Sequence, residues 1–146
     1  MPDIQINMLA VVIAVFANFF LGFLWYNKLF GKVWAKEMGF DIDVEPHKVE
    51  LFKSIGLAII GYFFLVYVLS HQIAVWNSES WGLGISQWSQ LERVTQAAFF
   101  IWLGFFVPVQ LNNVAWSKHS WKLFLINVSY HFVALFLVAS ILVYMG

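Results

Sequence analysis

The sequence contains no cysteine. Without cysteine the chain cannot form disulfides, thiolate metal sites or acylated thiols, and it cannot pass electrons through cysteine pairs. This absence excludes the small four-helix membrane oxidoreductases that depend on such pairs.

Charge is also scarce. Of the 146 residues 11% are charged and 62% are hydrophobic, whereas soluble domains have about 25% and roughly 45–50%. A small globule has too much surface for so few charged side chains to cover, so lipid must cover part of it. The eight basic residues only balance the eight acidic ones, and nucleic-acid binding requires a basic footprint. We therefore expect the lipid bilayer, and no nucleic acid, as a partner.

Four uncharged stretches predict transmembrane helices at residues 8–27, 54–76, 94–116 and 123–146. Each is long enough, at about 1.5 Å per residue, to cross an apolar layer roughly 30 Å thick. The first stretch shows no cleavable signal, so we expect it to be retained as a helix. The predicted fold class is an all-α membrane protein, a four transmembrane helix bundle that forms a single domain over residues 1–146.

The basic residues predict the orientation, because cytoplasmic loops near span ends retain positive charge. Arg93 is the only basic residue between the second and third stretches. The other two connections hold Lys28, Lys32, Lys36, Lys48, Lys53, Lys118 and Lys122. Both termini are therefore expected outside the membrane.

Four local features refine this picture. Residues 28–38 place three lysines on one helical stripe, which fits either a helix along the membrane surface or simple flanking charge. The second helix is expected to begin early, near Pro46, because proline suits a first helical position. Pro108 is expected to kink the third helix. The loop at residues 71–92 is rich in Trp, which favours a position at the membrane interface.

Polar side chains inside lipid are costly unless they meet one another, so their positions mark the candidate site. In the first stretch small and polar residues recur every four positions, and the fourth stretch carries a similar stripe. In the second, Gly56 and Gly61 are expected to pack closely beside a tyrosine. The cluster predicted from these faces comprises Asn18, Gly22, Trp25, Tyr26, Tyr62, Gln110, Asn113, Asn127, Tyr130 and His131.

Counting residues from the inner span ends gives the depth of each polar group. At about 1.5 Å per residue, His131 lies roughly 15 Å deep and Asn18 roughly 12 Å deep. Asn127 and Gln110 both lie roughly 9 Å deep. We therefore expect His131 to meet Asn18, with Tyr62 or Gln110 behind it.

The four stretches contain no Asp, Glu, Lys or Arg. Proton- and cation-coupled pumps usually need a carboxylate inside the membrane, so a small multidrug exporter is disfavoured. Enzymes that act on phospholipid head groups generally use clustered carboxylates and metal, and no nucleophile or phosphate-loop motif occurs. A haem site is disfavoured because His71 and His131 differ in depth. The sequence favours a non-catalytic protein, and we expect no cofactor and no metal.

Three segments together resemble a known family. They are Gly22-Phe-Leu-Trp25-Tyr26 with Phe30-Gly31-Lys32 and Trp34, then Trp102-Leu-Gly104-Phe105, and then Asn127-Val-Ser-Tyr130-His131. Over nearly the whole chain the sequence resembles the small bacterial membrane proteins catalogued as domain of unknown function 1761. The resemblance implies a four-helix protein of the bacterial inner (cytoplasmic) membrane and brings no established activity.

Three functions remain open at this point. The favoured one is a non-catalytic bundle with a polar, cytoplasm-facing cluster that binds a small solute or a lipid head group, although the same groups also fit simple interhelical packing. A transporter or channel would need a continuous water path and a small homo-oligomer. The third is an accessory subunit of a larger membrane complex.

Overall fold

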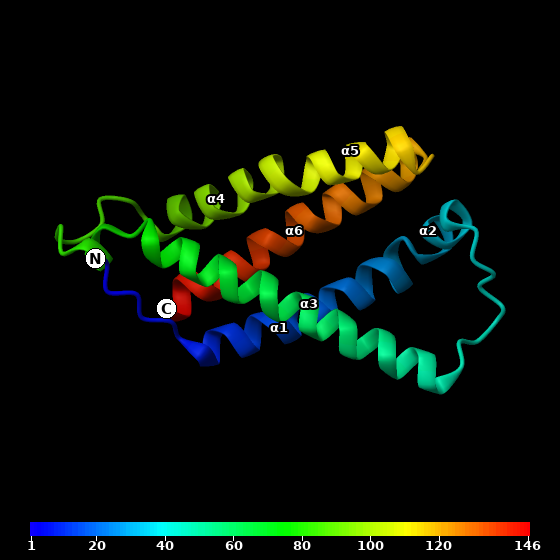
Figure 1. The fold of residues 1–146 in the computed structure, drawn as a ribbon, viewed down its shortest axis with the longest axis horizontal. Helices are drawn as coiled ribbons and strands as arrows, with labels where there is room; N and C mark the ends of the chain where they lie inside the picture. Colours follow the sequence, from blue (N-terminus) through cyan, green and yellow to red (C-terminus); the bar gives the residue numbers. More distant parts are fainter.

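The computed structural model describes all 146 residues, and its only regular structure is helical. Four spans run back and forth along the long axis, with both termini at one end (Figure 1). Each span is long and apolar enough to cross a membrane, which confirms the predicted all-α four-helix membrane bundle. The spans are α1 (Met8–Phe23) with the π-helical segment η1 (Leu24–Leu29), then α3 (Lys48–Val75), then α4 (Gln90–Ile101) with the π-helical segment η3 (Trp102–Phe106) and α5 (Val107–Trp116), and finally α6 (Trp121–Met145). The connections hold α2 (Gly31–Met38) and the 3-10 turn η2 (Ser78–Trp81).

Side chains cap the starts of α1, α3, α4 and α6. Asn7 accepts hydrogen bonds from the amides of Leu9 and Ala10 at the start of α1. Ser89 and Glu92 form a reciprocal capping box on α4. The second span begins at Lys48, close to the predicted start, but His47 is its capping residue, so Pro46 lies just before the helix and not within it. These caps satisfy amides that have no partner inside the helix.

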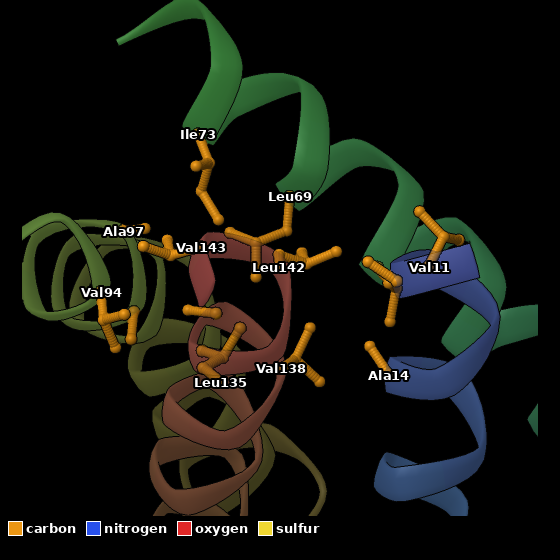
Figure 2. Close-up of a cluster of buried hydrophobic side chains, with 14 of the residues drawn as sticks. Val11, Ala14, Leu69, Ile73, Val94, Ala97, Leu135, Val138, Leu142 and Val143 are labelled. Atoms are coloured by element: carbon orange, nitrogen blue, oxygen red, sulfur yellow. The ribbon is translucent and has the colours of Figure 1, made fainter. Parts of the chain in front are cut away.

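The apolar core fills the half of the bundle nearest the termini. Its residues come from α1, α3, α4 and α6, and Figure 2 shows them converging on α6. Leu135 and Val138 of α6 are fully buried there, between Val11 of α1 and Val94 of α4. The fourth span is therefore the central helix, against which the other three pack.

The opposite end, which carries the seven lysines and is called the lysine end below, is more open. α3 packs through Val66, Leu69 and Ile73, while its first half is largely exposed and lies far from α5 (Figure 1). A Cβ built on Gly56 or Gly61 meets no atom within 4 Å. The prediction that these glycines pack closely is therefore wrong, because no other helix lies against either glycine, although Ile59 and Tyr62 of the same stretch still contact the bundle.

Residues 28–38 do not form one helix: η1 ends at Leu29 and α2 begins at Gly31, so Lys28 lies on a different segment from Lys32 and Lys36. α2 packs against α6, with Ala35 buried and the ring of Trp34 5.4 Å from that of Tyr26. The helix stops at Gly39, whose φ of 75° is a left-handed conformation that glycine adopts without strain. Its lysines remain exposed.

Candidate functional site

The π-helical segment η1 turns two aromatic residues toward α6. Its wider turns are marked by the bond from the Phe30 amide to the Trp25 carbonyl, five residues earlier. The indole N–H of Trp25 donates to the Ile126 carbonyl at 3.1 Å, and the hydroxyl of Tyr26 donates to Oδ1 of Asn127 at 3.0 Å. An α-helix would separate these neighbours more widely around its axis, so the π-helical turns let both side chains reach one helix. Such turns often occur at functional sites.

A second π-helical segment, η3 in the third span, also turns a tryptophan toward α6. It ends at Phe106, two residues before Pro108, which has no N–H to donate to the carbonyl of Gly104. Where the sequence predicts a kink, the structure widens the turns before the proline. Within them the indole N–H of Trp102 donates to the Val128 carbonyl at 2.8 Å. Two tryptophans thus bind α6 at carbonyls two residues apart.

One buried polar cluster joins α1, α3 and α6 around the hydroxyl of Tyr130. This hydroxyl donates to Oδ1 of Asn18 at 3.0 Å and lies 3.3 Å from the hydroxyl oxygen of Tyr62. A phenol carries one proton, so Tyr62 donates to Tyr130 when Tyr130 donates to Asn18. Asn18 is 2% exposed and Tyr130 is 3% exposed. We call these three residues the Asn18 cluster.

Gly22 leaves the space that the side chains of this cluster occupy. It lies one turn after Asn18 on α1, and a Cβ added to it would lie 3.0 Å from the hydroxyl oxygen of Tyr130 and 3.1 Å from that of Tyr62. The two phenols therefore approach the backbone of α1 at a point where only glycine leaves space.

The structure corrects the predicted partner of His131. His131 makes no hydrogen bond to Asn18, Tyr62, Gln110 or any other residue, whereas Tyr130 binds Asn18. Consecutive residues of a helix lie at nearly the same depth, so counting cannot separate Tyr130 from His131. The rotation of α6 decides which of them faces α1.

A second polar cluster lies nearer the lysine end. Nδ2 of Asn127 donates to Oε1 of Gln110 at 3.3 Å, and Nδ2 of Asn113 lies 3.5 Å from the same oxygen. Tyr26 completes the chain through its bond to Asn127. The ring of Tyr26 lies 4.9 Å from that of Tyr130, so the two clusters touch. All ten residues of the predicted cluster thus lie in one region of the bundle.

A cavity lies beside the Asn18 cluster, and we call it the His131 cavity. Its volume is ≈ 280 Å³, and most of its wall is apolar. The ring of His131 packs against Phe106, with 4.3 Å between the ring centroids. Gly61 lines the cavity and is exposed, so one wall opens to the surroundings of the bundle. The lining residues are Asn18, Ala58, Gly61, Tyr62, Leu65, Phe106, Tyr130, His131, Ala134 and Leu135.

The cavity presents hydrogen-bonding groups that the protein leaves without partners. The ring nitrogens of His131 have none, and the amide nitrogen of Asn18 has no acceptor although its oxygen is bound by Tyr130. A neutral imidazole donates from one nitrogen and accepts at the other. The wall contains no Asp, Glu, Lys or Arg. The arrangement can therefore hold an uncharged group that both donates and accepts.

Sequence reasoning missed two aromatic contributors, Trp102 and Phe106. Tryptophan prefers membrane interfaces, so Trp102 in the middle of a span was an available signal for a buried partner. Phe106 and the apolar lining residues Leu65 and Leu135 carry no such signal, because apolar residues in a span face lipid and protein alike.

Comparison with known proteins identifies a family without adding an activity. The model of the family described as a protein of unknown function, DUF1761, matches residues 9–143. No curated protein and no solved structure matches the chain. The matched range includes both π-helical segments and all ten residues of the polar cluster. The chain therefore belongs to the DUF1761 family of proteins of unknown function.

Proposed function

We propose that the protein is a non-catalytic membrane protein that binds a small uncharged molecule, or the uncharged head group of a lipid, in the His131 cavity. One observation carries this proposal. The imidazole of His131 lies half-buried in a cavity within a membrane span and has no hydrogen-bond partner in the protein. Inside a membrane span, a polar group without a hydrogen-bond partner is costly, and a ligand that bonds to it removes that cost.

The lining supports an uncharged ligand with an apolar part. Charged groups lose much of their hydration energy in such surroundings unless an opposite charge compensates, and this wall offers none. The volume of ≈ 280 Å³ lies just below the usual range of ligand sites, which is about 300 to 1,000 Å³. A small solute fits this size, and so does one end of a longer lipid that enters through the open wall at Gly61.

Binding is better supported than conduction. Between the cavity and the termini the bundle is closed by the apolar core, in which Val66, Leu135 and Val138 are fully buried. A channel would need a continuous polar path through this region. The cavity is instead a site with one accessible side.

The proposal includes an orientation in a bacterial inner membrane, with both termini outside. The support is the distribution of basic residues: seven lysines lie at one end of the bundle and Arg93 at the other. In this orientation the polar clusters belong to the cytoplasmic half of the bundle.

The test is to identify what copurifies with the protein. Extracts of the purified wild type and of His131→Phe are compared by mass spectrometry, because phenylalanine keeps the ring and removes both nitrogens. A molecule enriched with the wild type and lost with His131→Phe supports the proposal. The control is His71→Phe, since His71 lies in the same bundle but bonds to the Tyr67 carbonyl, away from the cavity. A bound molecule that survives in His131→Phe contradicts the proposal.

A further inference from the structure

A second hollow lies at the opposite end of the bundle, where α3 ends and α4 begins. Its volume is ≈ 380 Å³. It is separate from the His131 cavity and shares no residue with it. We call it the Arg93 hollow, and its lining residues are Gln72, Ile73, Trp76, Trp88, Arg93, Gln96, Ala97 and Phe100.

Arg93 is the only arginine of the chain, and it has no ionic partner. Its guanidinium has no carboxylate oxygen within 4.0 Å, although Asp3 and Glu79 line a neighbouring hollow that Arg93 also borders. The side chain is half-buried and makes no hydrogen bond to the protein. A guanidinium with five donors in a partly apolar wall favours an anionic acceptor from outside the chain.

The residues that line the rest of the hollow are of the types found where the head groups of a bilayer meet its acyl chains. Trp76 and Trp88 are 81% and 51% exposed, and tryptophan prefers this level of a bilayer. Phe100, two turns beyond Arg93 along α4, is 58% exposed and continues the apolar wall along the span. Gln72 also lines the hollow, and its Oε1 is buried without a donor, so a rotation of the side chain lets this oxygen accept a hydrogen bond from a hydroxyl group.

We propose that the Arg93 hollow binds an anionic phospholipid of the surrounding bilayer, with its phosphate on Arg93 and a head-group hydroxyl on Gln72. Its acyl chain lies along Ala97 and Phe100. The positive charge selects the anion, and the aromatic wall selects an amphiphile over a free phosphate. This site is independent of the ligand proposed for the His131 cavity, and either can exist without the other.

The test is a lipid titration of the purified protein in an uncharged detergent, followed by native mass spectrometry. Phosphatidylglycerol and phosphatidylcholine with identical acyl chains are compared. The wild type is expected to bind phosphatidylglycerol more tightly, and Arg93→Gln to lose this preference through an about fivefold weaker affinity for the anionic lipid. Arg93→Lys keeps the charge and is expected to retain much of the preference, which separates loss of charge from damage to the fold.

Lys118→Gln is the matched control, since it removes one positive charge at the lysine end and is expected to leave the preference unchanged. Free glycerol phosphate, the same anionic group without acyl chains, is expected to bind far more weakly than phosphatidylglycerol. The proposal is overturned if Arg93→Gln keeps the full preference, if Lys118→Gln loses it to the same extent, or if glycerol phosphate binds as tightly as the lipid.

Discussion

At the scale of single residues, Gly22 is a position between the spans that tolerates little added volume. A side chain there would push against the hydroxyls of Tyr130 and Tyr62, which are held by their hydrogen bonds. Gly22→Leu is expected to lower the free energy of unfolding by about 1–3 kcal/mol, the usual cost of overpacking. Thermal unfolding in detergent measures this. Gly56→Leu is the control, because a Cβ there meets nothing within 4 Å; equal melting of the two variants would contradict the packing described for Gly22.

Tyr130 offers a test of the Asn18 cluster itself. Tyr130→Phe keeps the ring and removes the oxygen that joins Asn18 and Tyr62. Interhelical hydrogen bonds in bilayers contribute on average about 0.6 kcal/mol each, so losing two is expected to cost about 1 kcal/mol. Tyr67→Phe is the matched control, since the hydroxyl of Tyr67 makes no hydrogen bond. If both variants unfold at the wild-type temperature, the cluster does not stabilise the bundle.

The same residues show how far sequence reasoning reaches at this scale. Depth is a linear count along a helix, so it correctly placed Asn127 level with Gln110, and these two bond. Which of two neighbouring residues faces across the bundle depends on the rotation of the helix, and packing sets that rotation. The count therefore chose His131 as the partner of Asn18 where the structure has Tyr130.

At the scale of helices, each of the two π-helical segments carries a tryptophan that forms a hydrogen bond to the backbone of α6. Trp25 and Trp102 donate to its carbonyls at Ile126 and Val128, so they are expected to limit opening of the helix there. Trp25→Phe and Trp102→Phe should each raise hydrogen–deuterium exchange in the α6 peptide that covers both carbonyls. Trp116→Phe is the control, because Trp116 is 83% exposed. Unchanged exchange in both variants would show that these bonds do not restrain α6.

Two features could not be predicted from the sequence: how closely α3 packs along its length, and the π-helical turns. Hydropathy fixes the length of a span, since lipid requires about the same length from each. It does not fix how closely a span packs, because an apolar face suits lipid and protein equally. Gly56 and Gly61 could thus be read as packing positions, although a Cβ at either glycine meets no atom within 4 Å. Pro108 indicated that its helix would depart from regular α-helical geometry. It did not indicate that the departure would be a π-helical segment before the proline.

At the scale of the whole molecule, orientation is the first prediction. A reporter that fluoresces only in the cytoplasm is expected to stay dark when fused to the C-terminus, because the seven lysines at the other end favour the cytoplasmic side. The same reporter inserted after Gly39, in the exposed loop between α2 and α3, is expected to fluoresce. A bright C-terminal fusion together with a dark loop insertion would reverse the orientation.

The central claim, that the His131 cavity holds a ligand, is tested most directly by filling it. Gly61 lines the cavity and has no neighbour within 4 Å of its Cβ position, so Gly61→Phe should add volume without straining the bundle. Gly56→Phe adds the same ring on the same helix outside the lining. Native mass spectrometry of the protein released from the membrane is expected to show an additional bound mass for the wild type and Gly56→Phe, and to lose it for Gly61→Phe. A bound mass that persists in Gly61→Phe, or no bound mass on the wild type, would contradict the claim.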